Sequence, residues 1–200
     1  MSGLRERRRL KAMRAIQDCA LDLFDERGFG AVTIEEIAAA AAISPSSVYR
    51  YFGTKEGIVV ADIEFDGMSA ETLEAFVDPD DLVASMLRTV GAYDVAHPGH
   101  TGDGPPAVTG PWRRIRYFFG EPSVRLAVLG TLDRAGQRVA PLIAARAGVE
   151  ETQARVIATA LAFGYFAALE QWYLNGGGRP IAEYVEDGMR PLRGIWPVPG

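Results

Sequence analysis

The first predicted helix has one apolar face. Its members are Ile16, Cys19, Ala20, Leu23 and Phe24. They recur at i, i+3, i+4, i+7 and i+8, the spacing of an amphipathic α-helix, while polar residues fill the other side. Gly28, in "RGFG", predicts the end of this helix. Because Cys19 lies on the apolar face, we expect a small hydrophobic side chain rather than a reactive thiol.

A second, short helix is predicted in "IEEIAAAAA". Thr33 and Glu36 have the spacing of a capping box, in which each side chain bonds to the other residue's backbone N–H. Val32 and Ile37 have the spacing of a hydrophobic staple around the same helix start. These signals agree, so the start of this helix is well defined by the sequence.

A third helix begins after a turn of about three residues. Ser44 is a preferred N-cap residue, Pro45 suits the first helical position, and Gly53 ends the helix. Ile43 and Val48 repeat the hydrophobic staple. Two short helices joined in this way predict a helix-turn-helix.

The rest of the chain also shows helical periodicity, without a convincing strand pattern. Predicted helices cover residues 55–77, 82–96, 112–119, 123–147, 150–175 and 180–192, with a Gly/Pro-rich loop at 97–111 and a break at 120–122. We therefore expect an all-α protein. A three-helix, helix-turn-helix domain would occupy residues 1–54 and a helical domain residues 55–200, with residues 55–77 as the connecting helix.

Composition limits the class of protein. Of the 200 residues, 48% are hydrophobic and 24% charged, as in globular proteins, and the single cysteine excludes an internal disulfide. The basic N-terminal stretch lacks the apolar run of a signal peptide, and no stretch approaches about 18 uncharged apolar residues. We expect a cytoplasmic protein that does not enter a membrane.

The net charge of −5 argues at first against a nucleic-acid partner, but the charge is unevenly distributed. Residues 1–14 contain six basic residues and one acid, a balance of +5. Residues 61–200 contain 12 basic and 18 acidic residues, a balance of −6. A basic segment on an acidic body is typical of proteins that touch a polyanion locally, although a frayed, solvated terminus would have the same composition.

The third helix separates apolar from polar side chains. At about 100° per residue, Pro45 and Phe52 fall on the side of Val48, which predicts the packed face. The other sides carry Ser46, Ser47, Tyr49, Arg50 and Tyr51. Arginine and short donors at the outward pole suit base edges in a major groove, and flanking groups suit phosphates. The alternative is an ordinary solvated helix, which two exposed tyrosines disfavour.

Residues 20–59 closely resemble the DNA-binding domain of the TetR family of bacterial one-component regulators. The matching features are Phe24, Arg27-Gly28, Thr33, Ile37-Ala38, Ser44, Val48-Tyr49, Tyr51-Phe52 and Lys55. The resemblance implies an all-helical homodimer with an N-terminal DNA-binding domain and a C-terminal ligand-binding and dimerisation domain. Ala42 departs from the pattern, since family members often have glycine in that turn.

The resemblance also implies a division of contacts with double-stranded DNA. Phosphate contacts are implied for Thr33, Tyr49, Tyr51 and Lys55. Base contacts are expected from Ser46, Ser47 and Arg50. The candidate DNA-binding residues are thus Thr33, Ser44, Ser46, Ser47, Tyr49, Arg50, Tyr51 and Lys55.

Aromatic residues concentrate in the C-terminal part, where they indicate core packing, a dimer interface or the wall of an apolar ligand pocket. For any single aromatic residue, packing is the simpler interpretation. Candidate ligand-binding residues are Arg88, Tyr93, Trp112, Arg116, Tyr117, Phe163, Tyr165, Phe166 and Trp172. Gly164, among bulky neighbours, would permit close helix contact across a dimer.

The loop at 97–111 is either a flexible connector or a lid over the pocket. It holds both histidines, His97 and His100, and with Asp103 as the only nearby carboxylate they do not indicate a metal site. The sequence contains no nucleophile paired with a base and no phosphate-binding glycine loop, so we expect neither catalytic residues nor a cofactor.

Three functions remain open from the sequence. The leading hypothesis is a transcriptional regulator, a repressor that a small, largely apolar or aromatic ligand releases from a palindromic operator. The second is a helical small-molecule-binding or enzymatic protein whose helix-turn-helix is incidental. The third is a DNA-binding regulator without an effector.

Overall fold

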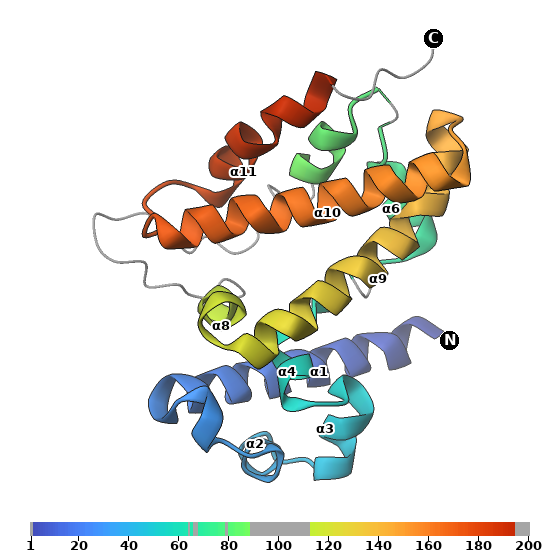
Figure 1. Ribbon diagram of the computed structural model, residues 1–200. Coiled ribbons are helices and arrows are strands. Elements are labelled where there is room, and N and C mark those ends of the chain that lie inside the picture. Colours follow the sequence, from blue (N-terminus) through green and yellow to red (C-terminus); the bar gives the residue numbers. More distant parts are fainter. Residues whose placement is uncertain (1, 64, 66–67, 79, 89–112, 195–200) are drawn as a thin grey trace. The chain divides into compact units, whose positions relative to one another are not determined.

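The computed structural model describes residues 2–63, 65, 68–78, 80–88 and 113–194 (Figure 1). Within these residues every regular element is a helix, which confirms the predicted all-α fold. The α-helices are α1 (Ser2–Arg27), α2 (Ile34–Ala40), α3 (Pro45–Phe52), α4 (Lys55–Val60), α6 (Ala70–Phe76), α8 (Ile115–Gly120), α9 (Pro122–Ala147), α10 (Glu151–Leu174) and α11 (Ile181–Met189). Two 3-10 helices are η1 (Phe29–Ala31) and η3 (Arg190–Gly194), and residues 82–88 are also helical.

The chain divides into two compact units. The first contains residues 1–68 and 114–129, and the second contains residues 69–113 and 130–200. The helix-turn-helix therefore forms one unit with α4, α8 and the first turns of α9. The sequence placed a domain boundary at residue 54; which domain carries which function stays a prediction.

The core of the first unit comes from the predicted apolar faces. Ile16, Phe24, Ile37, Val48 and Ile58 are almost completely buried there. Burying one such side chain contributes roughly 1.5–3 kcal/mol, so these faces hold the short helices together. The start signals of α2 and α3 are confirmed, since the side chains of Thr33 and Ser44 each accept a hydrogen bond from their own helix's first turn.

The predicted single helix over residues 55–77 is wrong. It ends at Val60, because Ala61 is extended (φ −61°, ψ 120°) and residues 61–62 are not helical. Ser69 then begins α6, its hydroxyl accepting from the Thr72 N–H at 3.1 Å. Ser69 is a preferred N-cap residue, so this second start was readable in the sequence.

The end of α3 and the first turn of α4 approach each other closely at one glycine. A Cβ on Gly57 would lie 2.0 Å from the carbonyl oxygen of Phe52, a contact that real side chains do not make. Glycine at this position therefore lets α4 start directly behind α3. Thr54 caps the new helix by accepting from the Gly57 N–H at 3.0 Å.

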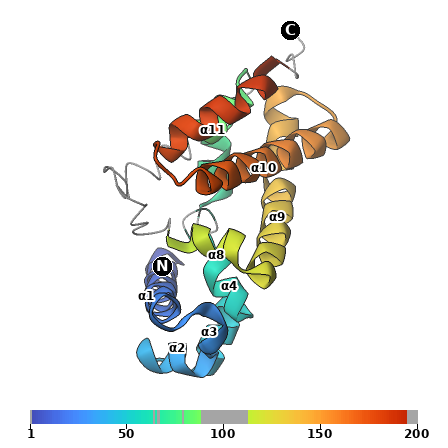
Figure 2. The same cartoon turned by 60° about the vertical axis from the view of Figure 1, so that its left-hand side comes forward.

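In the second unit, α10 and α11 lie side by side in both views (Figures 1 and 2). Gly188 faces Ala168, and Gly164 faces Met189 of the same chain. By length and composition α10 could cross a membrane, which is weak evidence because a soluble core helix passes the same test. Eight residues of α10, among them Phe166 and Trp172, are buried inside the chain.

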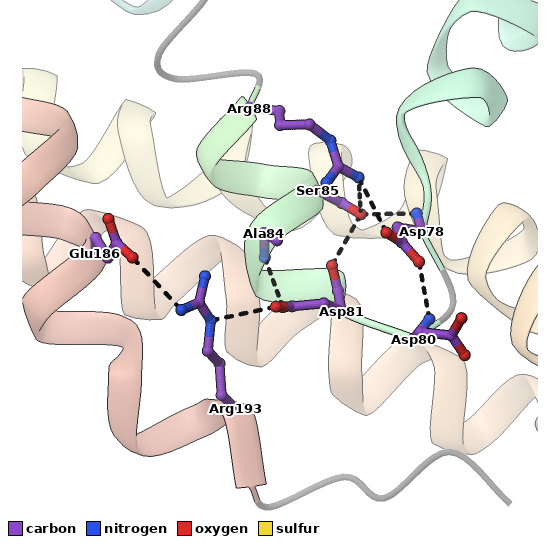
Figure 3. A network of polar contacts seen from close by, with 8 residues as sticks. All are labelled: Asp78, Asp80, Asp81, Ala84, Ser85, Arg88, Glu186 and Arg193. Carbon is purple, nitrogen blue, oxygen red and sulfur yellow. Dashed lines mark hydrogen bonds and ion pairs between the residues drawn. The ribbon is translucent and has the colours of Figure 1, made fainter.

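A polar network joins the segment around residues 78–88 to the end of α11 and η3 (Figure 3). Ser85 is buried and accepts from the Asp78 N–H at 2.7 Å, while Arg88 pairs with Asp78 at 3.7 Å. Arg193 reaches Asp81 and Glu186, each at 3.4 Å. Arg88 is thus held by protein groups within this unit.

The turn between α2 and α3 contains a strained alanine. Ala42 has φ 54°, the only positive φ among the non-glycine residues that the structure describes. The N–H of Ala42 bonds to the carbonyl of Ala39, and the N–H of Ile43 bonds to that of Ala38. This is the Schellman arrangement, whose left-handed position favours glycine.

Replacing Ala42 by glycine should therefore stabilise the protein. Left-handed strain on alanine exceeds the extra chain entropy of glycine, so Ala42→Gly should raise the free energy of unfolding by about 0.5–1 kcal/mol. Ala39→Gly, at an exposed position inside α2, is the matched control and should lower it by about 1 kcal/mol. Urea denaturation measures both free energies of unfolding, provided that their dependence on urea concentration is unchanged. An equal decrease in the two variants would show that Ala42 is not strained.

Candidate nucleic-acid interface

The start of α2 is held by a closed set of hydrogen bonds. Glu36 Oε2 accepts from the Thr33 backbone N–H at 2.8 Å and from the Thr33 hydroxyl at 3.0 Å. The Glu36 N–H donates to Thr33 Oγ1 at 3.2 Å, and Arg27 donates to Glu36 Oε1 at 2.7 Å. The Thr33 N–H, followed by the Arg27 guanidinium, lowers the pKa of the Glu36 carboxyl to about 2.

The structure separates the two sides of α3 largely as predicted. Val48 is fully buried, whereas Ser46 and Arg50 are exposed and Tyr49 retains 49% of its surface. Pro45, expected on the packed side, is exposed instead, because it occupies the first helical position at the end of the helix. An outward face with serine, tyrosine and arginine therefore stands opposite the Val48 contact.

Arg50 is oriented by its neighbours in the same helix. Its guanidinium donates to Ser47 Oγ at 3.4 Å and lies 4.9 Å from the centre of the Tyr51 ring. Ser44 Oγ lies within hydrogen-bonding distance of the hydroxyls of Ser46, at 2.9 Å, and Ser47, at 3.0 Å. Because a guanidinium carries five N–H donors, Arg50 keeps donors for a further partner.

Lys55 points into the first unit rather than away from it. Its ammonium group donates to the carbonyls of Phe29 at 2.7 Å and Val32 at 2.9 Å, and lies 4.4 Å from the centre of the Phe29 ring. Two of its three donors are thus engaged by the loop before α2. The sequence predicted a phosphate contact for Lys55 but not this role in fixing the loop.

Two further residues that hold the end of α4 in place were not predicted, because their partners are distant in the sequence. Gln17 donates to the carbonyls of Ile58, at 2.6 Å, and Ala61, at 3.1 Å, at the end of α4. The buried Arg114 also donates to the Ala61 carbonyl. No local pattern announces such long-range pairs, since each joins residues more than 40 positions apart.

The predicted ligand-binding residues that the structure describes are divided between the two units. Arg116 and Tyr117 belong to the first unit, where both side chains contact Asp25 of α1. The second unit holds Arg88, Phe163, Tyr165, Phe166 and Trp172. There Phe166 and Trp172 are buried, Phe163 is exposed, and Trp172 donates to the Arg179 carbonyl at 2.7 Å.

Several predicted features lie outside the described residues. They are Tyr93, Trp112, the loop at 97–111 and its two histidines. Among the described residues, no three His, Cys, Asp or Glu side chains are grouped so that they could hold a metal ion.

Comparisons with known proteins agree on the N-terminal segment. Residues 16–61 match the model of the family described as "Bacterial regulatory proteins, tetR family". The regulator BetI of Rhizobium meliloti is 33% identical over 82 residues, which cover 38% of this chain and 39% of BetI. The match thus spans about two fifths of the length of that curated relative.

Two comparisons extend over almost the whole chain. The regulator TcmR of Streptomyces glaucescens is 28% identical over 99% of this chain and 92% of its own length. The solved structure of Thermus thermophilus FadR, a TetR-family repressor in complex with lauroyl-CoA, has a TM-score of 0.57 and 20% identity. It covers 94% of this chain and 99% of its own, so the fold is shared along both domains.

The depressed pKa of Glu36 predicts an acid-sensitive α2. The ionised carboxylate stabilises the folded state fully above its unfolded pKa of about 4.5, and this contribution disappears as the pH falls through about 2. The free energy of unfolding of Glu36→Gln should therefore lie below that of the parent at pH 6 and converge with it between pH 4.5 and 2.

Urea titrations at several pH values measure this convergence. Glu35→Gln is the matched control, because it removes a carboxylate of the same turn that takes no part in the capping box. At pH 6 the free energy of unfolding of Glu35→Gln should differ less from that of the parent than the free energy of Glu36→Gln does. A Glu36→Gln difference that is constant from pH 6 to pH 2 would show that the carboxylate is not held as described.

Proposed function

Because this chain belongs to the TetR family of bacterial transcriptional regulators, we propose that it is a repressor that binds a palindromic operator through α3. The observation that supports this most directly is the outward face of α3, where Ser46, Tyr49 and Arg50 are exposed opposite the buried Val48. A short helix set against α2 by a tight turn is the geometry with which such proteins enter a major groove. A bacterial repressor that binds DNA would be located in the cytoplasm.

The proposed contacts divide the interface into reading and positioning groups. Arg50, with Ser46 and Ser47 beside it, would face base edges, and arginine pairs with the O6 and N7 atoms of guanine. Tyr49, Tyr51 and the groups at the starts of α2 and α4, Thr33 and Lys55, would contact phosphates. Ser44 would act through its bonds to Ser46 and Ser47, which hold the serine hydroxyls in place.

We propose that the repressor is a homodimer joined through α10. Val156, Phe163 and Leu174 are 57%, 37% and 65% exposed, and at about 100° per residue they fall within about 20° of one another. Three large apolar side chains in one exposed stripe are unusual on a monomer. A two-fold dimer would place its two α3 helices about 34–36 Å apart, one turn of DNA.

The proposed signal is a small, largely apolar or aromatic ligand bound in the C-terminal domain. Its support is the apolar composition of α10 and the shared fold of FadR, a protein that was solved with lauroyl-CoA. A ligand that favours a wider spacing of the two α3 helices would release the operator. A hundredfold loss of affinity needs about 2.7 kcal/mol of coupling, which a few contacts can supply.

Variants of α3 test the reading of DNA. An operator duplex is first selected by the parent chain from a random-sequence pool. Arg50→Ala should weaken operator binding by about 1–3 kcal/mol and lower the ratio of operator to random-duplex affinity. Tyr49→Phe should weaken both duplexes by the same factor, because phosphate contacts carry no sequence information. Tyr184→Phe, in α11, is the control and should bind as the parent does.

Fluorescence anisotropy with labelled duplexes measures these affinities. Parent-like binding of both duplexes by Arg50→Ala and Tyr49→Phe would show that this face of α3 does not meet DNA. A parent chain that selects no sequence at all would overturn the repressor assignment.

The dimer is tested by a charge placed in the α10 stripe. Phe163→Glu should be monomeric at concentrations at which the parent sediments as a dimer, because a carboxylate cannot be buried unpaired in an apolar contact. Leu126→Glu, at an exposed leucine of α9, is the matched control and should remain dimeric. Sedimentation velocity decides; a dimeric Phe163→Glu variant with parent-like circular dichroism would exclude this stripe.

A further inference from the structure

The helix-turn-helix has too little positive charge to bind DNA tightly by itself. Residues 33–57 contain two basic residues, Arg50 and Lys55, and three acids, Glu35, Glu36 and Glu56, which gives a balance of −1. Lys55 is already bonded to two carbonyls. Because affinity for DNA comes largely from cations that replace the counterions of phosphates, other basic residues of the first unit must supply it.

Those cations lie in the first turns of α1. Basic side chains are exposed at positions 5, 7, 8, 9, 11 and 14, with Glu6 as the one acid, and this acid is paired with Arg9 at 2.7 Å. Buried positions of the described side chains begin only at Met13. The preceding turns, about 16 Å long, therefore form a charged, exposed end of the helix, at the point marked N in Figure 1.

Helix stability does not explain this distribution of charge. Cations are unfavourable at a helix N-terminus, where the backbone dipole is positive, and the first turn of α1 contains no acid. Farther along α1 the exposed charges are the acids Asp18, Asp22, Asp25 and Glu26, followed by Arg27 in the last turn, which is paired with Glu36. Positive charge is thus concentrated at the end of the helix that tolerates it least, which favours an anionic partner at that end.

We propose that residues 5–14 of α1 form a second DNA-binding surface, which neutralises phosphates independently of sequence and supplies most of the affinity that α3 lacks. This inference rests on the proposed function. At about 100° per residue the cations cover all of the helix except an arc of about 140°. That arc holds Glu6 between Leu10 and the buried Met13, so these turns have no wide apolar face to insert into a lipid surface. The acids at 18–26 repel DNA from the other half of α1 and so orient the duplex toward the N-terminal turns.

The test compares a charge-neutralised variant with a matched control. The arm variant carries Arg5→Gln, Arg7→Gln, Arg8→Gln and Lys11→Gln. The control neutralises four exposed arginines of the second unit: Arg134→Gln, Arg146→Gln, Arg179→Gln and Arg190→Gln. A third variant, Arg5→Lys, Arg7→Lys and Arg8→Lys, keeps the charge. Anisotropy with the selected operator and a random duplex gives affinity as a function of salt for each full-length chain.

The arm variant should flatten the slope of log affinity against log salt by about 3.6 per bound chain, since each phosphate contact contributes about 0.9. It should weaken operator and random DNA by the same factor, so that their ratio is unchanged. The control and the lysine variant should keep the parent slope. An unchanged slope in the arm variant, or a changed operator-to-random ratio, would overturn the proposal.

Failure of this proposal and failure of the repressor assignment give different results. If Arg50→Ala lowers specificity while the arm variant keeps the parent slope, only the proposed DNA-binding surface at residues 5–14 is wrong. If the parent selects no sequence but the arm variant loses DNA binding, the surface at residues 5–14 is supported and base recognition by α3 is wrong. Binding of the parent to phosphatidylglycerol vesicles as tight as to DNA, lost in the arm variant, would replace DNA by a lipid surface.

Discussion

The hydrogen bonds of the Lys55 ammonium group hold the first unit in one arrangement. They join the first turn of α4 to the carbonyls of Phe29 and Val32, directly before the Thr33 cap of α2. The loop that orients α2 is thereby fixed to the helix that follows α3. Gly57 permits this because it lets α4 begin directly behind the end of α3. The short helices are marginal alone, and their packing and these ties give them a defined face.

Much of this unit could be predicted from the sequence because its signals are local. The Thr33–Glu36 capping box, the Ser44 cap and the end of α3 at Gly53 each depend on residues within a few positions of one another. The strain at Ala42 could also be anticipated, since glycine is the usual residue for a left-handed turn. The helix expected over 55–77 is the exception, since α4 ends at Val60 and the Ser69 cap marks the start of α6.

The contacts of the candidate sites were harder to predict because they join distant parts of the chain. The aromatic ring and hydroxyl of Tyr117 predict a pocket residue, which stays a prediction; they do not reveal that it packs on Phe24 and Phe29 and bonds to Asp25. The position of Lys55 predicts a phosphate contact but does not reveal the two carbonyls that it also bonds. Its carbonyl partners lie 26 and 23 residues earlier, and no periodicity in the sequence reveals such pairs.

In the proposed mode of binding, affinity and specificity depend on different parts of one unit, because α3 would read bases and the first turns of α1 would hold phosphates. Hydrogen exchange of backbone amides, with and without the selected operator duplex, locates both at once. The account predicts added protection in residues 33–36, 44–52 and 5–14, and none in residues 18–26. Protection confined to α10 and α11, or absent from 44–52, would contradict it.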